Sequence, residues 1–196
     1  MVKKEIFVVS GLGATPQDHW FPWLIDRINE QENLHAVTLE MPNPMAPELN
    51  KWVEKLAQEI PDLDENTYII THSLGSITTL NYLSELANRK EINIGGLLLV
   101  SGFSEKLPTL PLLDIFIDTA RDVDYDLIKQ VVKDNIIVVA SANDSIVPTE
   151  LTDQFAKQLN ADYYRKRGNG HFMKEDGFTE FPLLLQLLDQ LFNRVY

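Results

Sequence analysis

The sequence contains no cysteine, which excludes disulfide bonds and thiolate metal sites and fits a reducing compartment. It also lacks long hydrophobic runs, because no stretch approaches the roughly 18 apolar residues of a membrane span. The apolar run after Lys3 and Lys4 ends at Val9 and is followed by no cleavage site, so it is not a secretion signal. These absences predict a cytoplasmic protein that makes no contact with a membrane.

Basic residues are scarce, since 17 lysines and arginines are outnumbered by 29 aspartates and glutamates and the net charge is −12. Such a surface repels nucleic-acid phosphates, and the one dense basic stretch, residues 165–167, is short. The four histidines are dispersed and no H-E-x-x-H motif occurs, so no metal and no cofactor are expected. We expect a small-molecule substrate and no nucleic-acid partner, for a protein that is a monomer or a homodimer.

Strand-like and helix-like apolar patterns alternate along the 196 residues, which predicts a single α/β domain over residues 1–196. The strands are short and apolar on both faces, as in a mostly parallel sheet covered by helices on both sides. We expect a three-layer sandwich with the strand order 2-1-3-4-5-6. The expected strands are residues 5–10, 36–39, 68–70, 94–100, 136–140 and 161–165. Helices are expected from near His19, with Asp18 as the cap, and over residues 49–60, 74–83, 110–119, 125–132, 149–159 and 181–188.

A serine stands at the sharp turn between the third strand and the helix that follows it. Gly75 comes two residues after Ser73, where the backbone is crowded and a missing Cβ helps. This layout is typical of a nucleophile elbow, G-x-S-x-G, which raises a serine hydroxyl above the edge of the sheet. Thr71 stands at the position of the first glycine.

Two further polar residues follow the last two strands, at the edge of the sheet where active sites of parallel sheets gather. Asp144 comes after the fifth strand and His171 after the sixth, so the chain order is Ser, Asp, His, as in α/β-hydrolases. Because an imidazole ring exchanges protons near neutral pH, His171 can take the proton of Ser73, while Asp144 fixes the tautomer of the ring. Asp114 or Asp118 is the alternative acid if Asp144 faces away.

The oxyanion that forms during acyl transfer needs two hydrogen-bond donors. The N–H of Leu74, directly after the serine, is the first, and the N–H of Leu12, after the first strand, is the second. His72 adjoins the serine, but its side chain leaves the turn in another direction, so we interpret it as a packed or hydrogen-bonded residue of the elbow. His19 either lines the pocket or is a satisfied loop histidine.

With these residues in place, the chain resembles a known family, the small single-domain serine hydrolases related to retinoblastoma-binding protein 9, with bacterial members similar to YdeN. The resemblance covers essentially the whole chain, although Ser10-Gly11 stands where most α/β-hydrolases have His-Gly. The segments that carry it are Ser10–Gly13, Asp18–Trp23, Met41–Pro44, Thr71–Gly75, Leu99–Phe103 and Gly170–Phe172.

The resemblance implies an α/β-hydrolase core without a large lid, the Ser73–His171–Asp144 triad, and carboxylesterase activity on small acyl esters. Only residues 101–135 separate the fourth and fifth strands, which also argues against a large lid. As substrate-binding walls we expect Trp20, Phe103 and Phe172 beside Leu12, favouring short or medium apolar acyl groups.

Two other functions compete with this hypothesis. Gly11 and Gly13 after the first strand imitate a dinucleotide-binding fingerprint, but Pro16 stands at its third glycine and the helix begins late. A non-catalytic or partner-binding protein on a hydrolase fold is the second alternative, because a fold does not guarantee chemistry.

Overall fold

The chain folds around one six-stranded, fully parallel sheet in this computed structural model, which describes residues 2–60, 62–120 and 122–194. The strand order is β2-β1-β3-β4-β5-β6, as the sequence predicts. The strands are β1 (Lys4–Val9), β2 (Leu34–Leu39), β3 (Thr67–His72), β4 (Gly96–Val100), β5 (Ile136–Ser141) and β6 (Asp162–Lys166).

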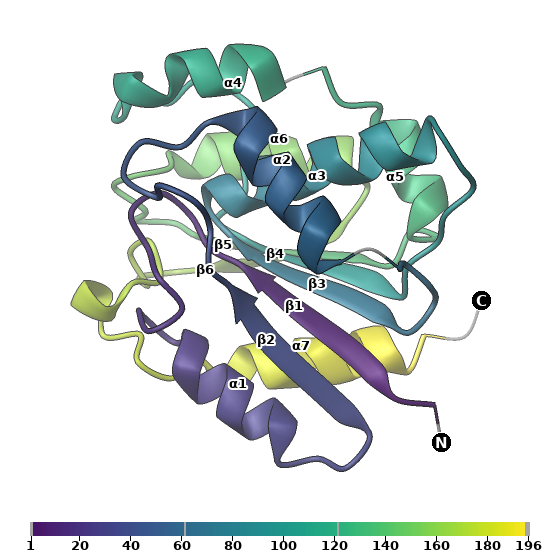
Figure 1. Ribbon diagram of the computed structural model, residues 1–196. Coiled ribbons are helices and arrows are strands. Elements are labelled where there is room, and N and C mark those ends of the chain that lie inside the picture. Colours follow the sequence, from purple (N-terminus) through teal and green to yellow (C-terminus); the bar gives the residue numbers. More distant parts are fainter. Residues whose placement is uncertain (1, 61, 121, 195–196) are drawn as a thin grey trace.

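Helices cover both faces of the sheet and make three layers (Figure 1). On one face lie α1 (Phe21–Asn29) and α7 (Pro182–Phe192). On the other lie α2 (Leu49–Glu59), α3 (Leu74–Ala87), α4 (Asp114–Ala120), α5 (Tyr125–Val131) and α6 (Thr149–Gln158). Two short 3-10 turns, η1 (Pro111–Leu113) and η2 (Lys174–Asp176), complete the elements.

The core consists of two apolar clusters separated by the sheet. Residues of β3 and β4 contribute to both clusters alternately, because successive side chains of a strand point to opposite faces. All residues of β3, β4 and β5 are buried, which explains why apolar residues occupy both faces of these strands rather than alternating with polar ones. The predicted α/β-hydrolase fold class is confirmed, and no lid domain stands among the described elements.

The first helix begins later than the sequence predicts. It starts at Phe21, with Trp20 as its N-cap residue and no side-chain cap. The carboxylate of Asp18 instead accepts hydrogen bonds from the N–H and the hydroxyl of Thr15, at 2.7 and 2.8 Å. Asp18 therefore closes the turn before the helix, and His19 lies outside the helix with φ of 53°.

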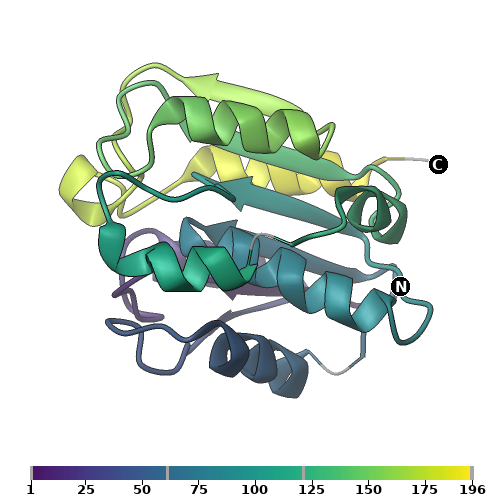
Figure 2. The same cartoon turned by 90° about the horizontal axis from the view of Figure 1, so that it is seen from above.

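The carboxyl ends of all six strands meet at one edge of the sheet, because every pair of neighbouring strands is parallel. The view in Figure 2 shows the loops that leave this edge gathered at one end of the molecule, opposite the labelled ends of the chain. Within the described residues, no helix is both long and apolar enough to cross a membrane.

Candidate active site

Ser73 occupies the turn between β3 and α3 with φ of 55° and ψ of −123°, a conformation that residues with a side chain rarely adopt. Its N–H donates to the carbonyl of Val100 at 2.8 Å, which ties the turn to the end of β4. The helix then passes β1 so closely that a Cβ on Gly75 would lie 2.4 Å from the carbonyl oxygen of Val9. Position 75 therefore requires glycine, in agreement with the elbow motif.

Thr71 fills the position that the elbow motif gives to glycine. It is the fifth residue of β3, fully buried, and its hydroxyl pairs with the hydroxyl of Ser76 at 2.6 Å. This bond crosses the turn from the strand to the first turn of α3. The threonine thus satisfies its own buried hydroxyl and braces the elbow from within.

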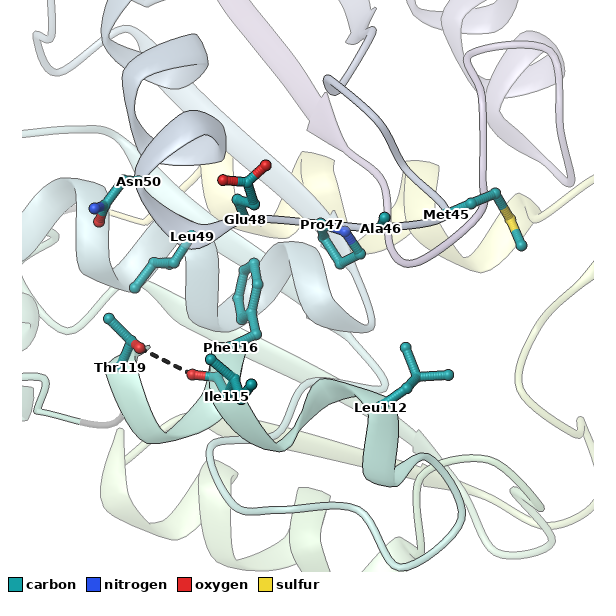
Figure 3. Close-up of a pocket in the computed structure, with 10 residues that line it drawn as sticks. All are labelled: Met45, Ala46, Pro47, Glu48, Leu49, Asn50, Leu112, Ile115, Phe116 and Thr119. Carbon is teal, nitrogen blue, oxygen red and sulfur yellow. Dashed lines mark hydrogen bonds between the residues drawn. The ribbon is translucent and has the colours of Figure 1, made fainter.

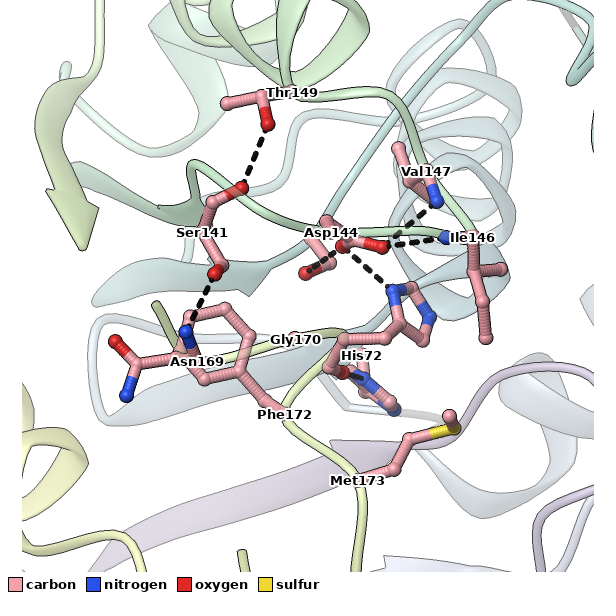
Figure 4. Close-up of polar contacts among 12 residues, drawn as sticks. His72, Ser141, Asp144, Ile146, Val147, Thr149, Asn169, Gly170, Phe172 and Met173 are labelled. Carbon is pink, nitrogen blue, oxygen red and sulfur yellow. Dashed lines mark hydrogen bonds and ion pairs between the residues drawn. The ribbon is translucent and has the colours of Figure 1, made fainter. Parts of the chain in front are cut away.

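Asp144 lies in the loop after β5, and its carboxylate accepts four hydrogen bonds. The N–H groups of Ile146 and Val147 both donate to Oδ1 at 2.9 Å (Figure 4). On Oδ2, the hydroxyl of Ser101 donates at 3.0 Å and Nδ1 of His171 lies at 2.7 Å. Four donors around two oxygens fix the orientation of the carboxylate.

His171 is oriented by that contact. A carboxylate only accepts, so Nδ1 carries a proton and Nε2 of the neutral ring keeps its lone pair. The imidazole and the Asp144 carboxylate are almost fully buried, with 4% and 3% of their side-chain surfaces exposed. The alternative acid Asp118 lies on α4 and forms an ion pair with Lys106 at 2.7 Å.

The backbone of His171 is held on both sides. Its N–H donates to Oδ2 of Asp176 at 2.8 Å, and its carbonyl oxygen lies 2.8 Å from Nε2 of His72. A Cβ at Gly170, where φ is 55°, would lie 2.1 Å from Oδ1 of Asp176, so this glycine lets the carboxylate approach. The Gly170 N–H also donates to Oδ1 of Asn143 at 2.9 Å, which anchors the histidine loop to the loop after β5.

His72 is a buried histidine that holds the backbone of His171 in place. Because the carbonyl oxygen of His171 only accepts, Nε2 of His72 carries the proton, while its buried Nδ1 has no partner among the described residues. Burial, with a further contribution from the nearby His171, lowers the pKa of His72 well below its ordinary value of 6.5. The ring is therefore neutral at pH 7, consistent with its interpretation as a packed residue.

The ring of His19 packs edge-on against the ring of His72, with 5.7 Å between the ring centroids. Its Nδ1 accepts the N–H of Lys174 at 3.0 Å, so the neutral ring carries its proton on Nε2. Burial lowers the pKa of His19 below its ordinary value of 6.5, although Asp18 and Glu175 oppose this shift.

A small cavity of about 130 Å³ brings the chemically important side chains together. Ser73 and His171 both line it, from loops that are far apart in the sequence. Leu12 lies on its wall, whereas Leu74 is fully buried as the first residue of α3. The remaining lining residues are Gly11, Ala14, His19, His72, Leu110, Ile146 and Met173.

The predicted aromatic walls are wrong, because Trp20, Phe103 and Phe172 have no exposed surface. The indole N–H of Trp20 donates to the carbonyl of Phe172 at 3.1 Å, and the Phe172 ring stacks on Phe181 at 5.0 Å in the core beneath the site. Large apolar rings that follow buried strands gain more by turning inward than by lining a cavity. Beside the serine and the histidines, the apolar part of the cavity lining comes instead from Leu12, Ala14, Leu110, Ile146 and Met173.

Several supporting residues have no role in the sequence prediction. Ser101 donates to Asp144 and Asp176 accepts from the backbone N–H of His171, and neither belongs to a motif that specifies its partner. Ser101 has a φ of 49° directly after β4, at the edge of the sheet where Ser73 and Asp144 also lie. Two signals in the sequence point to it: its place after a strand and its membership of the segment Leu99–Phe103, which carries the family resemblance.

Comparisons with known proteins agree over nearly the whole chain. A family model described as serine hydrolase matches residues 6–190. YdeN of Bacillus subtilis (strain 168) is 38% identical over 191 residues, which covers 97% of this chain and 97% of that protein. Serine hydrolase RBBP9 of Rattus norvegicus is 24% identical over 191 residues, which covers 96% of this chain and 95% of that protein.

Solved structures show the same architecture. The crystal structure of Bacillus subtilis YdeN has a TM-score of 0.91 and 36% identity, covering 98% of this chain and all of that chain. Est1E from Butyrivibrio proteoclasticus has a TM-score of 0.65 at 15% identity, covering 96% of this chain and 89% of that one. At that identity, the similarity to Est1E concerns the fold alone.

Proposed function

The chain belongs to the serine hydrolase family, and from that premise we propose that it hydrolyses carboxylic esters through an acyl-enzyme on Ser73. The contact that carries this proposal is the 2.7 Å approach of His171 Nδ1 to the Asp144 carboxylate, on a histidine that shares its cavity with Ser73. This contact leaves Nε2 as the basic nitrogen, which a serine nucleophile requires.

In the first half-reaction, Ser73 Oγ attacks the ester carbonyl carbon while His171 Nε2 accepts the hydroxyl proton. The tetrahedral intermediate collapses when the bond to the alcohol oxygen breaks, and His171 returns the proton to that oxygen. The acyl group is then esterified to Ser73, and the imidazolium has been stabilised throughout by Asp144.

The second half-reaction repeats these steps with water. His171 takes a proton from the water, the hydroxide attacks the acyl carbon, and the bond to Ser73 Oγ breaks as the serine recovers its proton. A carboxylic acid leaves, and the enzyme returns to its starting state.

The negative oxygen of each tetrahedral intermediate needs donors that are already in place. We assign this role to the N–H groups of Leu12 and Leu74. The first amides of a helix have no partner inside that helix, and Leu74 is the first residue of α3. Leu12 lines the cavity beside Ser73, and the neighbouring Gly11 is so close that a Cβ there would lie 2.8 Å from the Cβ of Ser73.

Covalent labelling with a fluorophosphonate probe tests the proposal, with intact mass and peptide mapping as the readout. We expect one adduct, on Ser73, and none on Ser73→Ala. The Ser73→Ala variant should keep the wild-type circular dichroism spectrum and lose turnover of p-nitrophenyl acetate. Wild-type turnover by folded Ser73→Ala, or a folded wild-type protein without an adduct, would refute the assignment and favour a binding protein on a hydrolase fold.

A further inference from the structure

A groove of about 680 Å³ runs across the surface next to the catalytic cavity. One wall is the segment of residues 45–50, which leads into α2, and the other is α4 with the turn η1 before it. Figure 3 shows these side chains facing one another across the groove, with Met45 and Leu112 at one end and Asn50 and Thr119 at the other.

The groove gathers apolar side chains that would otherwise be expected in the core. Met45, Leu112 and Ile115 expose 75%, 64% and 83% of their surfaces, and all three line the groove. The ring of Phe116 closes the floor and packs edge-on against Trp52 at 5.8 Å. Single exposed apolar residues are common, but several around one depression mark a binding surface.

Both walls of the groove continue from the catalytic cavity. On one side, Gly13 lies between two residues that line the cavity. Its N–H donates to the carbonyl oxygen of Pro44 at 2.8 Å, and a Cβ added at this glycine would lie 3.0 Å from Sδ of Met45. On the other side, Leu110 lines the cavity and Leu112, two residues later in the same turn, lines the groove. The Met45 and Leu112 end therefore adjoins the site of the reaction.

The two volumes are unequal in a way that constrains the substrate. The catalytic cavity holds about 130 Å³, well below the roughly 300–1,000 Å³ of typical ligand sites, whereas the groove lies within that range. The cavity has room for the reacting ester group and little more. The remainder of a larger substrate has to extend beyond it, and the groove begins where the cavity ends.

The lining of the groove selects for hydrocarbon. Among the described residues that line it, Glu48 is the one charged residue, it is paired with Lys51 at 2.5 Å, and none is a cation. The hydroxyl of Thr119 donates to the carbonyl of Ile115 in its own helix at 2.8 Å. A peptide in this groove would leave backbone polar groups with few partners, whereas an alkyl chain has none to satisfy.

We propose that this groove binds the hydrocarbon tail of an extended, unbranched acyl chain whose ester group is cleaved at Ser73. The inference rests on the function proposed above and names the substrate class, esters of medium to long fatty acids. Full burial of a methylene strengthens binding roughly fourfold, and an open groove buries about half of each one, so we expect roughly twofold per methylene.

The test is kcat/KM for p-nitrophenyl acetate, butyrate and octanoate. We expect octanoate to exceed butyrate on the order of tenfold in the wild-type protein. Ile115→Asp places a charge in the groove and should remove most of that ratio. Val2→Asp is the matched control, because Val2 is 72% exposed, lies outside the groove and gains the same charge. It should keep the wild-type ratio.

Acetate turnover separates the two proposals. Ser73-dependent acetate turnover without a chain-length preference, or with a preference that survives Ile115→Asp, would overturn the groove assignment alone. If none of the three esters is turned over, the proposed function fails, and binding of methyl octanoate to Ser73→Ala then decides on the groove. A shift of the Ile115 methyl NMR signal would support it, and no shift would overturn it. A dimer in sedimentation that Ile115→Asp dissociates would instead identify an interface between copies.

Discussion

Among single residues, Asp144 has the most closely defined surroundings, because its carboxylate accepts four hydrogen bonds. Asp144→Asn keeps the volume of the side chain but turns one oxygen into a donor, so His171 Nδ1 loses its acceptor and the ring adopts the wrong tautomer. By precedent from serine proteases, we expect a fall in kcat on the order of 10⁴. Ester turnover by Asp144→Asn, beside Asp114→Asn and Asp118→Asn as controls, measures it.

The outcome discriminates between the candidate acids. A near-normal rate in Asp144→Asn, with a large loss in one of the two controls, would move the acid to α4. The geometry favours Asp144, since Asp118 is already paired with Lys106.

The buried side chain of His72, again a single residue, makes the free energy of unfolding depend on pH. Its pKa in the folded protein is lowered by burial, whereas an unfolded histidine titrates near ~6.5. Below that pH the imidazole of His72 binds a proton in the unfolded state but stays neutral in the folded state. The lowered pKa of His72 therefore does not affect the free energy of unfolding above pH ~6.5. As the pH falls below ~6.5, the free energy of unfolding decreases by up to about 1.4 kcal/mol per pH unit.

Urea unfolding between pH 5 and pH 8 tests this linkage in His72→Gln, whose amide can still donate to the His171 carbonyl. We expect the variant to lose less free energy of unfolding on acidification than the wild-type protein. His35→Gln, at an exposed histidine paired with Glu5, serves as the control for loss of an imidazole. Equal slopes in His72→Gln and wild type would contradict the prediction.

The passage from β3 into α3 is the critical element of the fold. A Cβ at position 75 would lie 2.4 Å from the carbonyl of Val9, and backbone cannot yield as a flexible side chain does. We expect Gly75→Ala to lower the free energy of unfolding by about 2 kcal/mol or more, despite the better helix propensity of alanine. Chemical denaturation measures the effect.

Gly168→Ala provides the matched control, because a Cβ there would meet nothing within 4 Å. Such a surface substitution should change stability by less than about 0.5 kcal/mol. If Gly75→Ala were equally harmless, the helix would have to sit farther from β1 than described.

The sequence predicts which helices and strands form better than it predicts where each one begins. Five of the six strands follow from apolar runs, whereas β6 is polar and largely exposed. The predicted strand order is confirmed by the sheet, and the family resemblance by the match over residues 6–190. The start of α1 was predicted two residues early, because Asp18 closes a local turn with Thr15 rather than capping the helix. Both uses of a carboxylate look the same in a sequence.

At the scale of the whole molecule, the sequence predicts which side chains reach the active edge but not which way they face. Placement after parallel strands was enough to bring Asp144 to His171. The direction of Trp20, Phe103 and Phe172 depends on packing between distant segments, such as Phe172 on Phe181, which no local pattern encodes. The groove was missed for the same reason, since its walls are separated by most of α2, β3, α3 and β4.

The strand order has a consequence for a chain that is still being synthesised. After β1 and β2, each of the strands β3 to β6 adds to the same growing edge of the sheet, in the order in which the ribosome releases it. Ser73 follows the third strand, but His171 follows the sixth, so the proposed nucleophile is made almost one hundred residues before its base. If the proposed mechanism holds, a nascent chain therefore carries an inert serine until its last strand has docked.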